Sequence, residues 1–291
     1  MASPQTADET VHLRVFANSA NGGNPVVAVI EPRPAAPNDM RAIAERAGTE
    51  AGFVLPPTDA GKADVRFRFF NPRTEMEMCG HATLGMAWLL AKQGRLRPGT
   101  HRIETASGIV LARVSDSGAV AISQPSGTVE AVNPVLRPEV LDALGLSERD
   151  LLALPILNAT TSRKKTFIPL TSPQTVNALR PDHSAVEDVC AKLGSTGLYP
   201  FACDWDDERT YHARQFPAGA GIAEDPATGV AAAALYYALK QYGLIGTRRT
   251  IRVRQGEAMG RPSRIAVTEA NKGDAGAGVW LTGDAQIDER A

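Results

Sequence analysis

The sequence predicts an α+β fold of two similar halves, in each of which a curved sheet surrounds one buried helix. Residues 82–91 (ATLGMAWLLA) and 227–239 (ATGVAAAALYYAL) have helical character and are apolar on every side. A helix that is apolar all round must be buried all round. Segments with strand-like alternation flank both helices, as in VRFRFF at 65–70. A sheet wrapped around each helix is the simplest packing of such elements.

The first half reads as an alternation of strands, turns and helices. A polar, glycine-rich tract, SANGGNP, is expected to form the turn between the first two strands. A short amphipathic helix at 37–47 is followed by Gly48, its expected C-terminal stop. Strands are expected at 11–17, 24–31, 50–55, 64–70 and, as a hairpin, 101–123, with a second helix at 79–93.

The second half repeats this alternation of strands, turns and helices after a stretch rich in Pro, Ser and Gly near 125–135. We therefore expect a first domain at 1–128, completed by a C-terminal strand at about 278–291, and a second domain at 129–277. Within the second half, helices are expected inside 137–153 and at 173–180, 184–193 and 227–242, and strands at 164–170, 198–203, 209–216 and in most of the remaining C-terminal sequence.

An internal repeat links the two halves. Residues 66–90 and 211–239 each contain an alternating strand, then an aromatic residue, a proline, a short loop and an Ala-Thr pair at the head of the buried helix. The pairs Ala82-Thr83 and Ala227-Thr228 lie 145 positions apart, about half the chain. This order favours a two-fold pseudo-repeat. The alternative is a coincidence between two strand–loop–helix units, which are common.

Composition excludes several classes of function. The chain has 291 residues with a formal net charge of −1, so nothing indicates nucleic acid or an acidic membrane surface as a partner. No apolar run reaches the length of a membrane span, and residues 1–16 do not resemble a signal peptide. Three cysteines argue against a disulfide framework and favour the reducing cytoplasm. No nucleotide-binding or metal-binding motif is present, so we expect no cofactor and no metal.

The starts of the two buried helices are the first candidates for a binding site. Each start exposes unpaired backbone N–H groups and about half a positive charge. If the two halves face each other, both starts can point into one cleft. There they would bind a carboxylate or stabilise a developing oxyanion.

Four side chains near these starts have suitable chemistry. His81 can exchange a proton with a substrate, or it can merely satisfy backbone groups at a helix start. Asp225, before Pro226, resembles an ordinary helix N-cap, and its neighbour Glu224 is an alternative. Glu50 begins the strand-like run EAGFVLPP and can carry a proton if its surroundings are apolar, although most strand-edge carboxylates are solvated.

Cys79 is a fourth candidate, because a thiol at a helix start is activated. The alternative is an inert buried cysteine. No second cysteine lies at the other helix start, which weakens a two-thiol racemase.

Several segments together resemble one known family. They are VFANSANGGNPVVAV, TEAGFVLPP, RFFNPRTEMEMCGHATLGMAWLL, EDPATGVAAAAL and QGEAMGRPSRI. This set is similar to the PhzF-like family, which is named for a phenazine-biosynthesis isomerase and is related to diaminopimelate epimerase and proline racemase. The resemblance covers nearly the whole chain, and CGHAT followed by EDPATG at this separation is specific.

The resemblance implies two similar domains, each a mixed β-barrel around a central helix, and a homodimer. It also implies cofactor-independent acid/base chemistry, with Glu50 as proton carrier and with His81 and Asp225 as the other catalytic residues. Gly80 and Gly229 match backbone positions that bind the substrate carboxylate.

Two departures concern substrate binding. Serine usually precedes the family's glutamate, and Thr49 keeps that hydroxyl here. Serine usually follows the DPATG glycine, and Val230 removes that hydroxyl, which puts the phenazine substrate in doubt. We therefore expect an isomerase of a small carboxylated molecule, of the trans-2,3-dihydro-3-hydroxyanthranilate isomerase type. The alternatives are a Cys79-based epimerase or racemase and a non-catalytic small-molecule binding protein.

Overall fold

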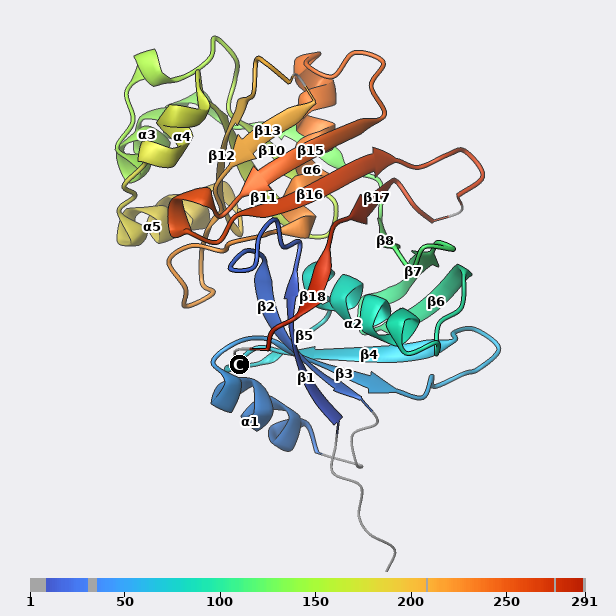
Figure 1. Ribbon diagram of the computed structural model, residues 1–291. Coiled ribbons are helices and arrows are strands. Elements are labelled where there is room, and N and C mark those ends of the chain that lie inside the picture. The colour runs from blue at the N-terminus through green and yellow to red at the C-terminus, as the bar shows by residue number, and fades with distance from the viewer. Residues whose placement is uncertain (1–8, 31–35, 208, 275, 290–291) are drawn as a thin grey trace, which may run out of the picture. The chain divides into compact units, whose positions relative to one another are not determined.

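The computed structural model describes residues 9–30, 36–207, 209–274 and 276–289 (Figure 1). The ends of the expected domains at 1–8 and 290–291, and residue 31 of an expected strand, lie outside these ranges. The chain divides into two compact units, the first comprising 1–15, 25–122 and 284–291 and the second 16–24 and 123–283. Each unit is therefore assembled from separate stretches of the sequence.

The first unit is built on a mixed sheet. Its strands follow the order β18-β1-β2-β3-β4-β6-β7-β8, in which β2 pairs in parallel with β3 and β4 with β6. The strands are β1 (Glu9–Val15), β2 (Asn24–Ile30), β3 (Ala51–Leu55), β4 (Val65–Phe70), the short β5 (Glu75–Met76), β6 (Gly99–Thr105), β7 (Gly108–Val114), β8 (Val120–Gln124) and β18 (Ala285–Ile287). Helix α1 (Pro37–Ala47) connects β2 to β3, and α2 (Gly80–Lys92) lies between β4 and β6 in the chain.

The second unit has the order β9-β10-β11-β12-β13-β15-β16-β17, with parallel pairs β11–β12 and β13–β15. Its strands are β9 (Thr128–Ala131), β10 (Leu157–Thr160), β11 (Lys164–Pro169), β12 (Gly197–Cys203), β13 (Thr210–Ala213), the short β14 (Phe216–Pro217), β15 (Thr250–Gln255), β16 (Ser263–Glu269) and β17 (Val279–Thr282). Its helices are α3 (Arg137–Leu144), α4 (Pro173–Ala178), α5 (His183–Leu193) and α6 (Gly229–Tyr242). Short 3₁₀ turns lie at Pro134–Leu136, Glu148–Asp150 and Glu257–Met259.

The two units repeat one plan. In each, the third and fourth strands of the sheet are parallel, the fifth and sixth are parallel, and the apolar helix connects the fifth to the sixth. Thus α2 corresponds to α6, and the pair β2–β3 corresponds to β11–β12. The internal repeat expected from the sequence is present at the level of whole elements.

The apolar helices form the centre of each unit. The side chains of α2 are buried from Gly80 to Ala87, and those of α6 from Ala231 to Tyr236. Helix α2 contacts β1, β3, β7 and β18, while α6 contacts β9, β10, β11, β16 and β17. Strands that are far apart in the sheet therefore meet the same helix, as expected for a sheet curved around it (Figure 1).

The outer faces of the sheets are covered as well. Phe53 packs with Met40 and Ala44 of α1, whereas its neighbour Gly52 lies against Met86 of α2. In the second unit, α3 and α5 cover the face that carries Ile168 and Leu198. Successive strand residues point to opposite faces, so both faces of these strands are apolar because both are buried.

The helix starts expected from the sequence are only partly correct. His81 lies within the helix expected at 79–93 and is the second residue of α2, whose N-cap is Cys79. Asp225 is not an N-cap, because α6 begins at Gly229 after the N-cap Thr228. The Ala-Thr pairs therefore occupy different places: Ala82 and Thr83 lie inside α2, and Ala227 and Thr228 precede α6.

None of the helices in the described ranges has both the length and the apolar character needed to cross a membrane.

Candidate active site

The start of α2 brings together three of the residues singled out in the sequence. Cys79 has an extended backbone as N-cap, Gly80 is the first helical residue and His81 the second. The Cys79 Sγ lies 3.5 Å from His81 Nδ1 and 3.8 Å from Nε2. Both side chains are buried. The thiol and the imidazole therefore form a close pair at the start of the helix, where the first N–H groups have no partner within the helix itself.

Glu50 lies beside this pair. It directly precedes β3, and its backbone oxygen accepts a hydrogen bond of 2.9 Å from Val27 N. Its Oε2 is 3.9 Å from His81 Nε2. The Glu50 side chain is 29% exposed and that of His81 only 9%. A carboxylate with access to solvent thus lies next to a nearly buried imidazole.

Thr49 supports the position of Glu50. Its Oγ1 is 3.1 Å from the backbone oxygen of Pro25 and 3.4 Å from Glu50 Oε2. The first unit therefore gathers Thr49, Glu50, Gly80 and His81, four of the seven residues predicted for the site, together with Cys79.

The start of α6 holds the other three. Gly229 is the first helical residue and Val230 the second, which is the position that His81 has in α2. A Cβ at Gly229 would lie 3.0 Å from Leu281 Cδ1 and 3.5 Å from the ring of Phe16. Phe16 has φ of 63°, a left-handed conformation that is costly for a bulky residue. The helix start is thus closely packed, and glycine fits there because it has no side chain.

Asp225 is held by a dense hydrogen-bond network within the second unit. Its Oδ1 accepts from Asn24 Nδ2 at 2.6 Å, and its Oδ2 accepts from Thr228 Oγ1 at 2.6 Å. Asn24 Nδ2 also lies 2.9 Å from the backbone oxygen of Ala227. Both carboxylate oxygens are therefore engaged, and the side chain has a fixed orientation before the start of α6.

Gln255 connects this loop to the sheet. Its Nε2 donates to the backbone oxygen of Asp225 at 2.6 Å and to Thr228 Oγ1 at 3.0 Å. Its Oε1 accepts from Tyr199 Oη at 2.9 Å and from Thr228 N at 3.3 Å. Burial raises the pKa of the Tyr199 hydroxyl, so this group stays a donor. All four hydrogen bonds are internal, and they fix residues 225–228 in a non-helical conformation.

Sequence reasoning gave no role to Asn24, Tyr199, Thr228 or Gln255. Asn24 lies in SANGGNP and Gln255 opens QGEAMGRPS, so both belonged to segments already noted. A signal was therefore present for those two residues, but their hydrogen-bond partners lie far away in sequence.

Glu224, the alternative to Asp225, has another partner. It accepts two hydrogen bonds from Arg214, of 2.9 Å at Nε and 2.7 Å at Nη2. The two side chains are 10% and 8% exposed. Such a buried, bidentate ion pair holds both oxygens of Glu224 and neutralises its charge, so Glu224 has a structural partner of its own within the second unit.

Within the described residues, no group of three or more His, Cys, Asp and Glu side chains could hold a metal ion. The chemical groups at the two helix starts are instead an acid, an imidazole, a thiol and backbone N–H donors. These groups can bind an anion and exchange protons.

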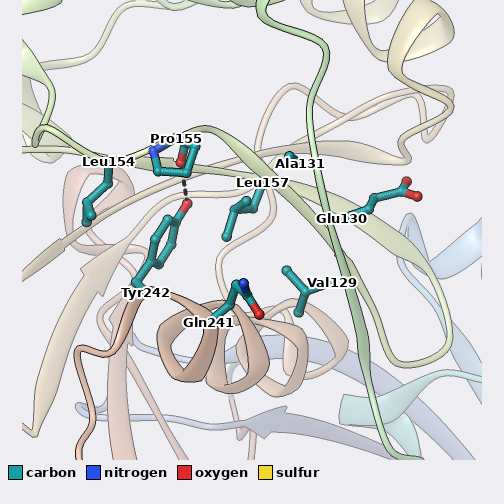
Figure 2. A pocket seen from close by; sticks show the side chains of 8 residues that line it. All are labelled: Val129, Glu130, Ala131, Leu154, Pro155, Leu157, Gln241 and Tyr242. Atoms are coloured by element: carbon teal, nitrogen blue, oxygen red, sulfur yellow. Dashed lines mark hydrogen bonds between the residues drawn. The ribbon is translucent and has the colours of Figure 1, made fainter.

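A surface hollow of about 270 Å³ lies elsewhere in the second unit (Figure 2). Its lining includes Leu157 of β10 and Gln241 and Tyr242 at the end of α6, and Tyr242 Oη donates to the backbone oxygen of Pro155 at 2.7 Å. Its volume is below the usual range of small-molecule sites. None of its lining residues belongs to the candidate site.

Comparison with known proteins identifies the family. A family model described as phenazine biosynthesis-like protein (PhzC-PhzF) matches residues 13–290. The chain belongs to this family. The PhzF-like chain is 31% identical to the trans-2,3-dihydro-3-hydroxyanthranilate isomerase of Pseudomonas chlororaphis, over 91% of each chain. It is 30% identical to the uncharacterized isomerase YddE of Escherichia coli K12, over 96% of each.

Solved structures agree with this assignment. A PhzF-family phenazine biosynthesis protein of Bacillus anthracis has a TM-score of 0.84 at 26% identity, covering 96% of this chain and 97% of that one. A hydroxyproline epimerase of Agrobacterium vitis has a TM-score of 0.65 at 14% identity, with 96% and 90% covered, and shows the fold alone. The predicted fold class and the resemblance stated from the sequence are both confirmed.

Proposed function

We propose that this PhzF-like protein is a cofactor-independent isomerase that moves a proton on a small carboxylated substrate. The observation that carries the proposal is the approach of Glu50 Oε2 to within 3.9 Å of His81 Nε2 at the start of α2. An accessible carboxylate beside a nearly buried imidazole provides a proton acceptor and a second proton donor in one place. The matching relatives that are named isomerases support the reaction class.

Glu50 is the proton carrier in this proposal. Its carboxylate removes a proton from a carbon atom, and the electron pair of the broken C–H bond moves into the adjacent conjugated system. The protonated Glu50, whose side chain has access to solvent and can exchange its proton there, then donates a proton to another carbon, so no oxidant or reductant is required. His81 stabilises the charge that develops, and the hydroxyl of Thr49 orients the carboxylate.

The backbone N–H groups of the helix starts bind the substrate carboxylate in this proposal. Gly80 and Gly229 are each the first residue of a helix, where N–H groups have no partner within the helix. Asp225 orients the substrate as a fixed acceptor, since Asn24 and Thr228 hold both of its oxygens. We propose further that the two compact units correspond to the two domains expected from the sequence and that the protein acts in the cytoplasm.

The test is the substitution Glu50→Gln. It removes the proton carrier and keeps the size of the side chain, so turnover and exchange of substrate protons with deuterated solvent should fall by at least a factor of about 100. Binding and thermal unfolding should stay close to those of the parent protein. Glu45→Gln, which alters an exposed carboxylate on α1, is the matched control.

Full activity of the Glu50→Gln protein would refute the assignment. If the parent protein binds small carboxylates but exchanges no proton, the third hypothesis, a non-catalytic binding protein, is supported instead.

One observation favours a second candidate, an epimerase that uses Cys79. Its Sγ is 3.5 Å from His81 Nδ1, so the imidazole can accept the thiol proton. Cys79→Ala should abolish such an activity, whereas Cys203→Ala, which alters another buried cysteine, should not. A Cys79→Ala protein that keeps its full rate would eliminate the thiol as an acid/base.

A further inference from the structure

Lys165 is a buried cation in the second unit that the proposed reaction does not use. It belongs to β11 and is 5% exposed. Its neighbour Lys164 lies on the other face of the strand and forms an ion pair of 2.6 Å with Glu130. Because strand side chains alternate, Lys165 points away from that face. Helix α5 covers the face of β11 that carries Lys164, because Asn158 Nδ2 of the neighbouring strand β10 lies 3.4 Å from the backbone oxygen of Leu193 in α5. Lys165 therefore points toward the opposite face of the strand, which α6 contacts.

The Lys165 ammonium is held close to the loop that carries Asp225. Its Nζ donates to the backbone oxygen of Thr196 at 3.0 Å. The next residue, Gly197, lies against Gln215, whose Nε2 would be 2.2 Å from a Cβ at that glycine. Gln215 in turn accepts a backbone hydrogen bond of 3.1 Å from Asp225 N. A short series of contacts therefore connects Lys165 to Asp225.

The charge of Lys165 has no carboxylate at ion-pair distance among the described residues. Burial lowers the pKa of its ammonium to about 8, and Asp225 is the acid that most strongly opposes this decrease. Arg163 acts in the same direction as burial, and the thiol of Cys190 acts against it. Both amide atoms of Gln215 are buried and make no hydrogen bond within the described part of the chain.

The internal repeat gives this arrangement a counterpart. The strands β11 and β12 correspond to β2 and β3, and Thr196 precedes β12 as Glu50 precedes β3. In the second unit the Lys165 ammonium therefore contacts Thr196, the residue that occupies the same place before its strand as Glu50, the candidate proton carrier of the first unit.

We propose that Lys165 is a positioning residue that acts through Asp225, because its ammonium is the buried counter-charge that keeps this carboxyl group ionised. Ionisation matters for the geometry. A carboxylate accepts hydrogen bonds at both oxygens, as Asn24 and Thr228 require, whereas a protonated carboxyl group would present an O–H toward one of these donors. Loss of the charge on Lys165 should therefore loosen the network before α6.

The direct test is a titration of the Asp225 carboxyl by ¹³C NMR, assigned by its absence in Asp225→Asn. An opposite charge nearby lowers a carboxyl pKa by about 1–3 units. Lys165→Met should therefore raise the pKa of Asp225 by about one unit, and Lys165→Arg should leave it close to the parent value. Lys164→Met is the matched control, since it removes an equal charge from the other face of the same strand.

The reciprocal measurement does not depend on the stability of the Lys165 variants. In Asp225→Asn, the pKa of Lys165 should fall below the parent value of about 8, because the acid that opposes the effect of burial is removed. An unchanged pKa of Lys165 in this variant, or of Asp225 in a folded Lys165→Met protein, would overturn the proposal.

The consequence for turnover rests on the proposed function. If Asp225 must be ionised, the acidic limb of the kcat/KM profile should move to higher pH in Lys165→Met and return in Lys165→Arg. Because the two NMR titrations need no substrate, they test the charge coupling even if the Glu50→Gln experiment shows that the proposed isomerase reaction is wrong.

Discussion

Val230 occupies the position at which the resemblance to the family leads us to expect a serine. It is the second residue of α6, it is partly exposed, and its backbone oxygen lies 3.5 Å from Thr161 Oγ1. An isopropyl group at this position offers no hydrogen bond to a substrate. A hydrogen bond contributes about 0.5–1.5 kcal/mol, so its absence can change the choice of substrate without changing the chemistry.

We expect Val230→Ser to raise kcat/KM for trans-2,3-dihydro-3-hydroxyanthranilate about 2- to 10-fold, as one additional hydrogen bond would. Steady-state kinetics with that compound measure the change. Val230→Ala is the control, because it shortens the side chain without adding a hydroxyl. An equal gain in both variants would show that space, and not the hydroxyl, limits binding.

The sequence could not decide between Glu224 and Asp225. Both are acids before Pro226, and both are equally compatible with a helix start. The distinction comes from long-range partners, since Glu224 pairs with Arg214 while Asp225 binds Asn24, 201 positions away. By contrast, Glu50 and His81 were selected from the short motifs TEAGFVLPP and CGHAT; the structure places their side chains 3.9 Å apart, and their catalytic roles stay a prediction.

At the scale of elements, the contact of α2 with β1 depends on a small residue. A Cβ at Gly85 would lie 2.6 Å from Val15 Cγ2 and 3.3 Å from Leu13 Cδ1. In an exposed helix, alanine would stabilise relative to glycine by about 1 kcal/mol. Here the steric overlap with a stiff, β-branched side chain should outweigh that gain.

We expect Gly85→Ala to lower the free energy of unfolding by about 1–3 kcal/mol, as measured by urea denaturation. Adding Val15→Ala should recover part of the loss, because it removes the methyl group that the new Cβ meets. If the changes in the free energy of unfolding caused by Gly85→Ala and Val15→Ala simply added in the double variant, the proposed overlap would be contradicted.

Helix bounds were predictable where the signals are local. The helix at 37–47 has Pro at its start, Gly48 with φ of 63° at its end, and buried Met40 and Ala44 one turn apart, and it was predicted with its observed bounds. The start of α6 was not predictable, because the Asp-Pro pair is a local signal for a helix N-terminus. Gln255, 30 positions away, overrides this signal by holding the loop before Gly229.

At the scale of the whole molecule, the sequence predicted the α+β class and the existence of a repeat but misplaced its register. The helices α2 and α6 begin at Gly80 and Gly229, so Gly80 corresponds to Gly229 and the Ala-Thr pairs do not correspond. The two identical Ala-Thr dipeptides led to the wrong correspondence between the halves, because a helix can begin before or after the same dipeptide.

The assembly state is a further prediction at this scale. We expect the purified protein to be a homodimer, so light scattering after size-exclusion chromatography should give about twice the chain mass of 30.9 kDa. The measurement should be repeated over a tenfold range of protein concentration. A single-chain mass at every concentration would refute the dimer.

We also expect isomerase activity to be independent of metals and cofactors. Treatment with EDTA followed by gel filtration should leave kcat and the melting temperature close to their starting values. Recovery of a lost activity by an added divalent cation would contradict the proposed mechanism.

The pairing of β1 with β18 has a consequence for how the protein is made. Arg14 and Asp288 form a salt bridge of 2.6 Å although 274 positions separate them. During synthesis the second unit has its whole sequence once residue 283 has been added, whereas the first unit still lacks β18. A nascent chain therefore carries β1 with one edge unpaired until β18 (Ala285–Ile287) has been synthesised. Although β1 is synthesised before every strand of the second unit, its edge is protected only after all of those strands have been added.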